Sequence, residues 1–204
     1  MKNNKINQIH KALDNLNVKK TKESLSEKRR VEINNIESKY NVYIHDEYKE
    51  ILLNYEELFF DNEVRYTPIE NSPCTFEDGT QSFDGFFGLN GKENLDEQIK
   101  CYWERMPKSL VPIGECPGGN LICIGIDRGH LDKIYFWNHE NELEAKIMAG
   151  YVTCKNEIDS YWDNLYLVAE TLLDFINSLQ VFEGNERVSV DDIEMWLDDD
   201  LLND

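Results

Sequence analysis

The sequence lacks several features that mark common classes of protein. Basic side chains are scarce, with 21 Lys and Arg against 40 Asp and Glu, which gives a net charge of −19 at pH 7. Such a field repels nucleic acids and anionic membranes and attracts basic partners. No stretch approaches the roughly 20 apolar residues that span a bilayer. Residues 1–20 are polar and lack the apolar core of a secretory signal. We therefore expect a cytoplasmic protein that binds neither nucleic acid nor membrane.

Cysteine is sparse and shows no pairing pattern. The five cysteines are Cys74, Cys101, Cys116, Cys123 and Cys154. Their number is odd, they show no CxxC spacing, and most of them lie within apolar runs. This usage predicts reduced, buried thiols and argues against a disulfide framework or a zinc site.

Motifs for catalysis and metal binding are absent or incomplete. His139-Glu140 lacks the second His of a metalloprotease helix, because position 143 is Leu. His130 leaves a two-His site geometrically open, but a strand end that hydrogen-bonds the next loop explains His139 more simply. Residues 117–120, Pro-Gly-Gly-Asn, lack the Lys-Ser/Thr of a phosphate loop and predict a tight turn. No GxSxG elbow occurs. We predict no catalytic residues, no metal and no cofactor.

The chain does contain enough apolar residues for a sizeable core. Of its 204 residues 41% are hydrophobic, including 9 Phe, 10 Tyr and 4 Trp. Charge is unevenly distributed: residues 1–24 carry a net +4, residues 181–204 a net −8, and the remainder −15. We predict a basic helical extension and linker over 1–25, one domain over 26–180, and an acidic extension over 181–204. A short helix is expected from Ser189, and we expect the body to fold without either extension.

Hydrophobic spacing predicts the helices. Ile6, Ile9, Leu13 and Leu16 form one face of a helix that can dock on the body or bind a partner, and docking is the simpler interpretation. Further helices are expected over about 26–40, from Asp46 as N-cap to Tyr55, and from Asn94 until Pro107. The widest stripe, from about 162 to 180, predicts one long helix: Leu165, Val168, Leu172, Phe175, Ile176 and Leu179.

Strand candidates lie between these helices. They are residues 59–66, residues 83–89 with a bend at its glycines, the apolar run 121–126, and its hairpin partner 133–137. Helices, then strands, then helices, without strand–helix alternation, predict an α+β fold. We expect a largely antiparallel or mixed sheet with helices packed against it.

The order of these segments resembles the SUKH superfamily in its Smi/Knr-like branch, over about residues 26–180. The matching pieces are Glu37 and Tyr40, residues 48–53, Phe-Phe-Gly-Leu at 86–89, Leu-Val-Pro-Ile-Gly at 110–114, Gly-Gly-Asn-Leu-Ile-Cys-Ile-Gly at 118–125, Ile-Tyr-Phe-Trp-Asn-His-Glu at 134–140, and the helix with Phe175 and Leu179. Two pieces depart from the family pattern. Ile44-His45 replaces a Leu-Pro, and residues 54–56 replace an Asn-Gly-Gly turn.

Bacterial members of this superfamily are mostly immunity proteins that block polymorphic toxins by binding them. The resemblance therefore implies a non-enzymatic protein that occludes the active site of a cognate toxin. The acidic charge favours a basic, nuclease-type toxin domain as the partner. A regulatory or scaffold module with another intracellular protein partner is the alternative. The oligomeric state and the identity of the toxin are left open.

The predicted partner-binding residues lie around strand ends and loops, where acids gather. Tyr161 and Trp162 join them as aromatic anchors, or else fasten the following helix to the core. The set is Glu77, Asp78, Asp84, Glu115, Asp127, Asp132, Glu140, Tyr161 and Trp162.

Overall fold

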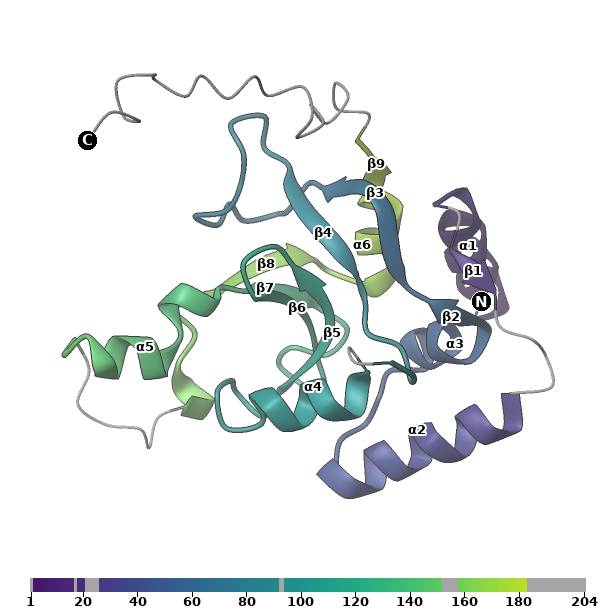
Figure 1. Ribbon diagram of the computed structural model, residues 1–204, viewed down its shortest axis with the longest axis horizontal. Helices are drawn as coiled ribbons and strands as arrows, with labels where there is room; N and C mark the ends of the chain where they lie inside the picture. The colour runs from purple at the N-terminus through teal and green to yellow at the C-terminus, as the bar shows by residue number, and fades with distance from the viewer. Residues whose placement is uncertain (1, 17, 21–25, 92–93, 152–157, 183–204) are drawn as a thin grey trace, which may run out of the picture.

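The computed structural model describes residues 2–16, 18–20, 26–91, 94–151 and 158–182. Helices and an antiparallel sheet occupy these ranges in the order expected of an α+β protein. Figure 1 shows the sheet strongly curled, with helices beside it. The predicted fold class is confirmed. Within the described residues no helix has the length and apolar character needed to cross a membrane.

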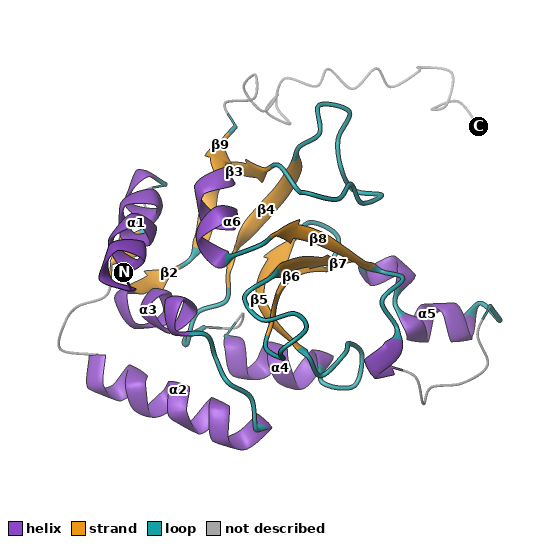
Figure 2. Cartoon of the chain, turned by 180° about the vertical axis from the view of Figure 1, so that it is seen from behind, coloured by secondary structure: helices purple, strands orange, loops and turns teal. Residues whose placement is uncertain are grey.

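The N-terminal third is helical. It contains α1 (Lys2–Asn15), the short strand β1 (Lys19–Lys20), α2 (Ser26–Tyr40) and α3 (Asp46–Asn54). Ile9 and Leu13 of α1 are fully buried. Figures 1 and 2 both show α1 beside α6, which it contacts. The prediction that this segment docks on the body is confirmed.

The helix α2 owes part of its attachment to a charged side chain that the apolar pattern does not reveal. Arg29, 2% exposed, donates from Nη1 to the carbonyls of Leu52 (2.5 Å) and Tyr55 (2.6 Å). These are carbonyls of the last turn of α3 and the residue after it, where a helix leaves acceptors without internal partners. Arg29 therefore joins α2 to the end of α3.

A seven-stranded antiparallel sheet forms the centre of the molecule. Its spatial order is β8-β7-β6-β5-β4-β3-β9, and β1 pairs separately with β2 (Tyr55–Glu57). The strands are β3 (Phe59–Tyr66), β4 (Gln81–Phe86), β5 (Leu110–Cys116), β6 (Asn120–Gly125), β7 (Ile134–Trp137), β8 (Leu165–Ala169) and β9 (Gln180–Val181). The four strand candidates are confirmed, as is the tight turn at 117–119, where both glycines have positive φ.

The edge strand β8 does not leave all its backbone groups open. The amides of Ile69 and Glu70 donate to the carbonyls of Val168 (3.0 Å) and Leu167 (2.8 Å). The Glu70 carboxylate also accepts from the Leu167 amide at 2.8 Å. The β3–β4 loop therefore extends the curled sheet past β8 and covers part of that edge.

The remaining helices are short. They are α4 (Leu95–Tyr102), the 3-10 turn η2 (His139–Asn141), α5 (Leu143–Met148), the 3-10 turn η3 (Ile158–Ser160) and α6 (Leu172–Ser178). Asn94 caps α4 by accepting from the Glu97 amide at 3.0 Å, as predicted. On α6, Phe175 packs edge-on against Tyr66, Phe83 and Phe86, with ring centroids 5.1–6.0 Å apart. This aromatic cluster fixes α6 on the β3–β4 part of the sheet.

The prediction of one long helix over 162–180 is wrong. Leu165 and Val168 belong to strand β8, and only the C-terminal part of the apolar stripe lies on a helix, α6. The helix starts after Thr171, whose hydroxyl accepts from the Asp174 amide at 3.1 Å. The apolar residues of β8 and α6 together happen to follow the spacing of one continuous helix, which explains the wrong prediction.

Several smaller expectations need correction or stay untested. Asp46 is the first residue of α3 and not its N-cap, which is His45. Strand β5 was not predicted from the residue pattern, because its Pro112 and Gly114 disfavour a central strand. Cys101 is exposed, whereas Cys116 and Cys123 are buried as expected. Cys154 and the helix expected from Ser189 lie outside the described residues, and the domain boundaries stay a prediction.

Candidate partner-binding surface

The predicted partner-binding residues lie on loops and strands at several places around the sheet. Glu77 and Asp78 lie in the β3–β4 loop, Asp84 on β4, Glu115 on β5, Asp127 and Asp132 in the β6–β7 turn, Glu140 on η2, and Tyr161 and Trp162 shortly before β8. The carboxylates divide into those that hold local structure and those that do not, and this division decides which are available to a partner.

The β6–β7 turn is organised by its own two acids. Asp127 Oδ1 accepts from the backbone amides of Gly129 (3.1 Å) and His130 (3.0 Å). Asp132 has a positive φ of 69° and lies 2.6 Å from Nε2 of His45. His45 occupies the position where the resembled family carries a proline, so this departure ties the start of α3 to the turn. Both acids therefore have a structural role beside any role in binding.

An aromatic cluster stands next to that turn. Trp162 stacks on His130 with ring centroids 4.1 Å apart, and meets Tyr135 edge-on at 5.4 Å. His130 Nδ1 lies 2.8 Å from the Tyr135 hydroxyl. Burial raises the pKa of Tyr135, and the carboxylates of Glu170, Glu70 and Asp127 raise it further. The structure thus brings a half-buried Trp, one of the two predicted anchors, next to several carboxylates.

The second predicted anchor, Tyr161, is committed to the adjoining loop. Its hydroxyl donates to the Asn141 carbonyl at 2.9 Å, and the ring is half-buried. It therefore fastens the segment before β8 to η2. Neither residue fastens a following helix to the core, because the strand β8 follows them. Tyr161 is attached to η2, and Trp162 packs against the β6–β7 turn and stays partly exposed, so their role as anchors stays a prediction.

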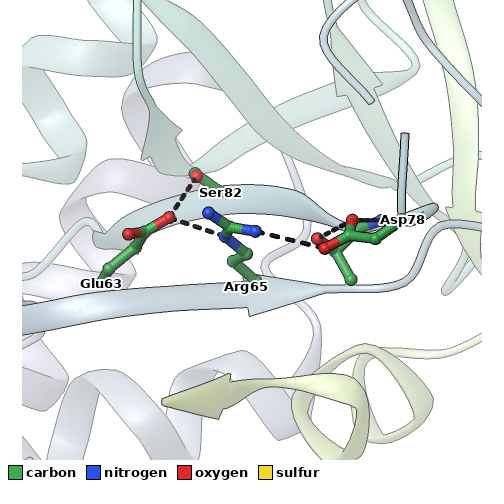
Figure 3. A network of polar contacts seen from close by, with 5 residues as sticks. Glu63, Arg65, Asp78 and Ser82 are labelled. Atoms are coloured by element: carbon green, nitrogen blue, oxygen red, sulfur yellow. Dashed lines mark hydrogen bonds and ion pairs between the residues drawn. The ribbon is translucent and has the colours of Figure 1, made fainter. Parts of the chain in front are cut away.

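A polar network around Arg65 on strand β3 reaches into the β3–β4 loop, and sequence reasoning missed it. Arg65 Nε donates to Glu63 at 2.6 Å, and Nη1 contacts Asp78 at 3.4 Å. Ser82 donates to the same Glu63 oxygen at 3.5 Å, as Figure 3 shows. Asp78 also accepts from the amide and hydroxyl of Thr80. These hydrogen bonds lower the pKa of Asp78, and Arg65 contributes further, so this carboxylate is ionised at neutral pH.

The same loop is anchored beside η2 through Cys74. Its sulfur accepts from the side-chain amides of Asn138 (3.6 Å) and Asn120 (3.8 Å). Burial raises the pKa of the Cys74 thiol; Glu140 adds to this, while the two amide donors oppose it. The carboxylate of Glu140 and the β3–β4 loop therefore belong to one neighbourhood.

Three of the predicted acids do not hold any local structure together within the described residues. Among the described residues, no hydrogen bond or ion pair engages the side chains of Glu77, Asp84 and Glu140. Asp84 differs from the other two because it is only partly exposed, and burial raises the pKa of its carboxyl group. A partly desolvated carboxylate without a partner lowers stability, which is typical of residues kept for binding.

The buried thiols of the described region are poorly suited to nucleophilic chemistry. Burial raises the pKa of the Cys116 and Cys123 thiols, and this disfavours the thiolate that a nucleophile needs. Across the described ranges, no group of three or more His, Cys, Asp and Glu side chains is arranged to hold a metal ion. His139 Nε2 lies 3.7 Å from Glu142, which itself binds Arg105.

A cleft of about 670 Å³ lies beside the end of α4 and is less suited to a charged partner. Its lining includes the cations Lys100, Arg105 and Lys108 and the acids Glu104 and Glu144. Arg105 is already engaged by both oxygens of the buried Glu142, at 2.8 and 2.9 Å. The cleft therefore has nearly balanced charge, unlike the acidic loops.

Comparison with known proteins identifies a family and a curated relative. A family described as "SMI1-KNR4 cell-wall" matches residues 30–151. A protein of Bacillus subtilis (strain 168), described as "SPbeta prophage-derived uncharacterized protein YokK", is 35% identical over 145 residues. That match covers 69% of this chain and 65% of the relative, so the chain spans slightly less than two thirds of the relative's length.

Proposed function

The chain belongs to the SMI1-KNR4 family, the SUKH group that its sequence resembles, and from this premise we propose that it is a bacterial immunity protein. In this role it acts in the cytoplasm without catalysis, and it neutralises a cognate polymorphic toxin by covering the toxin's active site. The proposed partner is a basic, nuclease-type toxin domain.

The proposal rests on the negative charge of the body and on a set of carboxylates that make no hydrogen bond or ion pair within the described residues. Glu77, Asp84 and Glu140 have no partner among the described residues, and the body between the extensions carries a net −15. A nuclease must hold phosphates and therefore has a basic cleft. An acidic protein imitates the polyanion and is steered toward that cleft, which raises the association rate.

Tight binding needs more than charge. Interfaces are held mainly by a few desolvated anchors, typically Trp, Tyr and Arg, surrounded by polar contacts. Trp162 supplies such an anchor next to Asp127 and Asp132, since it is partly exposed and its ring is fixed by His130 and Tyr135. The proposed mechanism is thus electrostatic steering followed by seating of rigid aromatic side chains.

Co-expression tests the proposal directly. Each protein encoded next to this gene is expressed in a bacterial host with and without the full chain, and growth is followed to find a toxin among them. The proposal predicts rescue of growth together with a stoichiometric complex of the two proteins. A toxin that still kills the host in the presence of the folded chain would reject the immunity role. A stable complex with a non-toxic intracellular protein would then favour the alternative, a scaffold module.

A further inference from the structure

An arginine on strand β3 is enclosed by two phenyl rings at the surface. The guanidinium carbon of Arg65 lies 4.3 Å from the ring centroid of Phe76 and 3.6 Å from that of Phe182. Phe76 comes from the β3–β4 loop, and Phe182 directly follows β9, where its amide donates to the Glu63 carbonyl at 2.8 Å. We call this arrangement of Phe76, Arg65 and Phe182 the Phe–Arg–Phe stack.

The stack lies on the outer side of strand β3. Val64 and Tyr66, the strand neighbours of Arg65, are buried in the core with exposures of 2% and 1%. Because side chains alternate along a strand, Arg65 points away from that core. Phe76 and Phe182 remain 44% and 41% exposed. The two half-exposed rings both contact Arg65. Together they form a rigid apolar surface on an otherwise polar side of the sheet.

The charge of the stack itself is already compensated, and its surroundings are acidic. Glu63 and Asp78 hold the guanidinium from its edge (Figure 3), and the Arg65 side chain is only 16% exposed. Glu77 is exposed in the same loop and has no partner in the described part of the chain. The three acids outnumber the single Arg, so a cation approaching the rings meets a net negative field.

We propose that the Phe–Arg–Phe stack is an anchor site for an arginine of the basic partner, an inference that rests on the proposed function. The partner's guanidinium lies on the outer face of Phe76 or Phe182, so that rings and guanidinium groups alternate along the extended stack. Its charge is then met by Glu77, Asp78 and Glu63. Cations prefer the faces of aromatic rings, and a planar guanidinium stacks on them while its edge stays free to bind carboxylates. The two rings are pre-organised for this contact, because Arg65 holds them in place before binding.

The test uses the full chain with ¹³C-labelled phenylalanine and a synthetic hexa-arginine peptide as the probe. Addition of the peptide is expected to shift the ring signals of Phe76 and Phe182 to saturation. Replacing both rings, Phe76→Leu with Phe182→Leu, should weaken peptide binding about five- to thirtyfold, the loss of two exposed cation–π contacts. Phe59→Leu is the matched control, because Phe59 also lies on β3 and is 41% exposed; it should leave the affinity unchanged.

Several outcomes would overturn the assignment. One is the absence of ring shifts, and another is an equal loss of affinity in the Phe59→Leu control. Nuclear Overhauser contacts from the Phe76 ring to residues 183–204 in the free chain would assign the stack to the chain's own C-terminal segment. Ring shifts that depend on protein concentration alone would assign it to a second copy. The growth test separates the two proposals: rescue by the Phe76→Leu, Phe182→Leu variant with undiminished toxin binding rejects the stack and leaves the immunity role standing. Failure of the unaltered chain to rescue rejects that role alone.

Discussion

At the scale of single residues, the acidic side chains of this protein perform different tasks that their sequence positions do not distinguish. Asp127 orders a turn, Asp132 binds His45, and Asp78 holds Thr80 and Arg65. Glu77, Asp84 and Glu140 do none of this. The sequence could identify the acidic loops but not this division, because hydrogen bonds to backbone amides depend on the local turn geometry.

Asp84 offers a test of the idea that a carboxylate is retained at a cost in stability. Burial raises its folded-state pKa, so the neutral form is favoured by folding, and ionisation above the unfolded pKa lowers stability. Asp84→Asn should therefore raise the melting temperature at pH 7 by no more than about 4 °C. The gain should disappear as the pH falls below the unfolded pKa of Asp. Thermal melts of both proteins between pH 3 and 7 measure this, and a lower melting temperature for Asp84→Asn at pH 7 would contradict it.

Leu172 tests the core at the same scale. It is fully buried at the start of α6, and Leu172→Asp places a charge there without a partner. We expect a loss of several kcal/mol from a total stability of roughly 5–15 kcal/mol, enough to unfold much of the protein. Asn177→Asp adds the same charge at an exposed position of α6 and serves as the control. Circular dichroism of the two variants compares them, and a near-normal melt for Leu172→Asp would show that the site tolerates charge.

At the scale of elements, sequence periodicity located most helices and strands but not every boundary. The helices over 26–40 and from Asn94, and the strands over 59–66 and 121–126, follow from spacing and capping residues alone. The segment 162–180 was misassigned because a strand and a helix in succession happened to share one apolar stripe. The Thr171–Asp174 cap was the local signal of the true helix start. The burial of Arg29 could not be predicted, because nothing in the sequence distinguishes a buried arginine from an exposed one.

Helix α1 contributes apolar side chains to the core of the molecule. Ile9 and Leu13 are fully buried in the same core as the sheet, so we no longer expect residues 1–20 to be dispensable. Leu13→Ala should lower the free energy of unfolding by about 2–5 kcal/mol through lost burial and the cavity left behind. Lys11→Ala, at an exposed position of the same helix, should change it little. Urea denaturation of both variants decides the point, and equal stabilities would mean that α1 packs without contributing to the fold.

At the scale of the whole molecule, the charge is the property most directly connected to the proposed function. The net −19 is not confined to the C-terminal extension, since the body carries −15. The structure also identifies which acids can be altered safely. Glu77 and Glu140 are exposed and make no hydrogen bond or ion pair within the described residues, so reversing them to Lys should slow association and leave the fold intact. Reversing Asp198 and Asp199 in the tail should slow association less.

The most direct test of the central claim is the association rate between the chain and the toxin domain identified by co-expression, measured by stopped flow across a salt series. The Debye length falls from about 30 Å at 0.01 M salt to about 3 Å at 1 M, so steering between opposite fields is screened. We predict that the association rate constant falls steeply over this range while the dissociation rate constant changes little, because aromatic anchors hold the complex. Glu77→Lys with Glu140→Lys should show a slower and flatter dependence. An association rate that is independent of salt for the unaltered chain would contradict electrostatic steering by the acidic body.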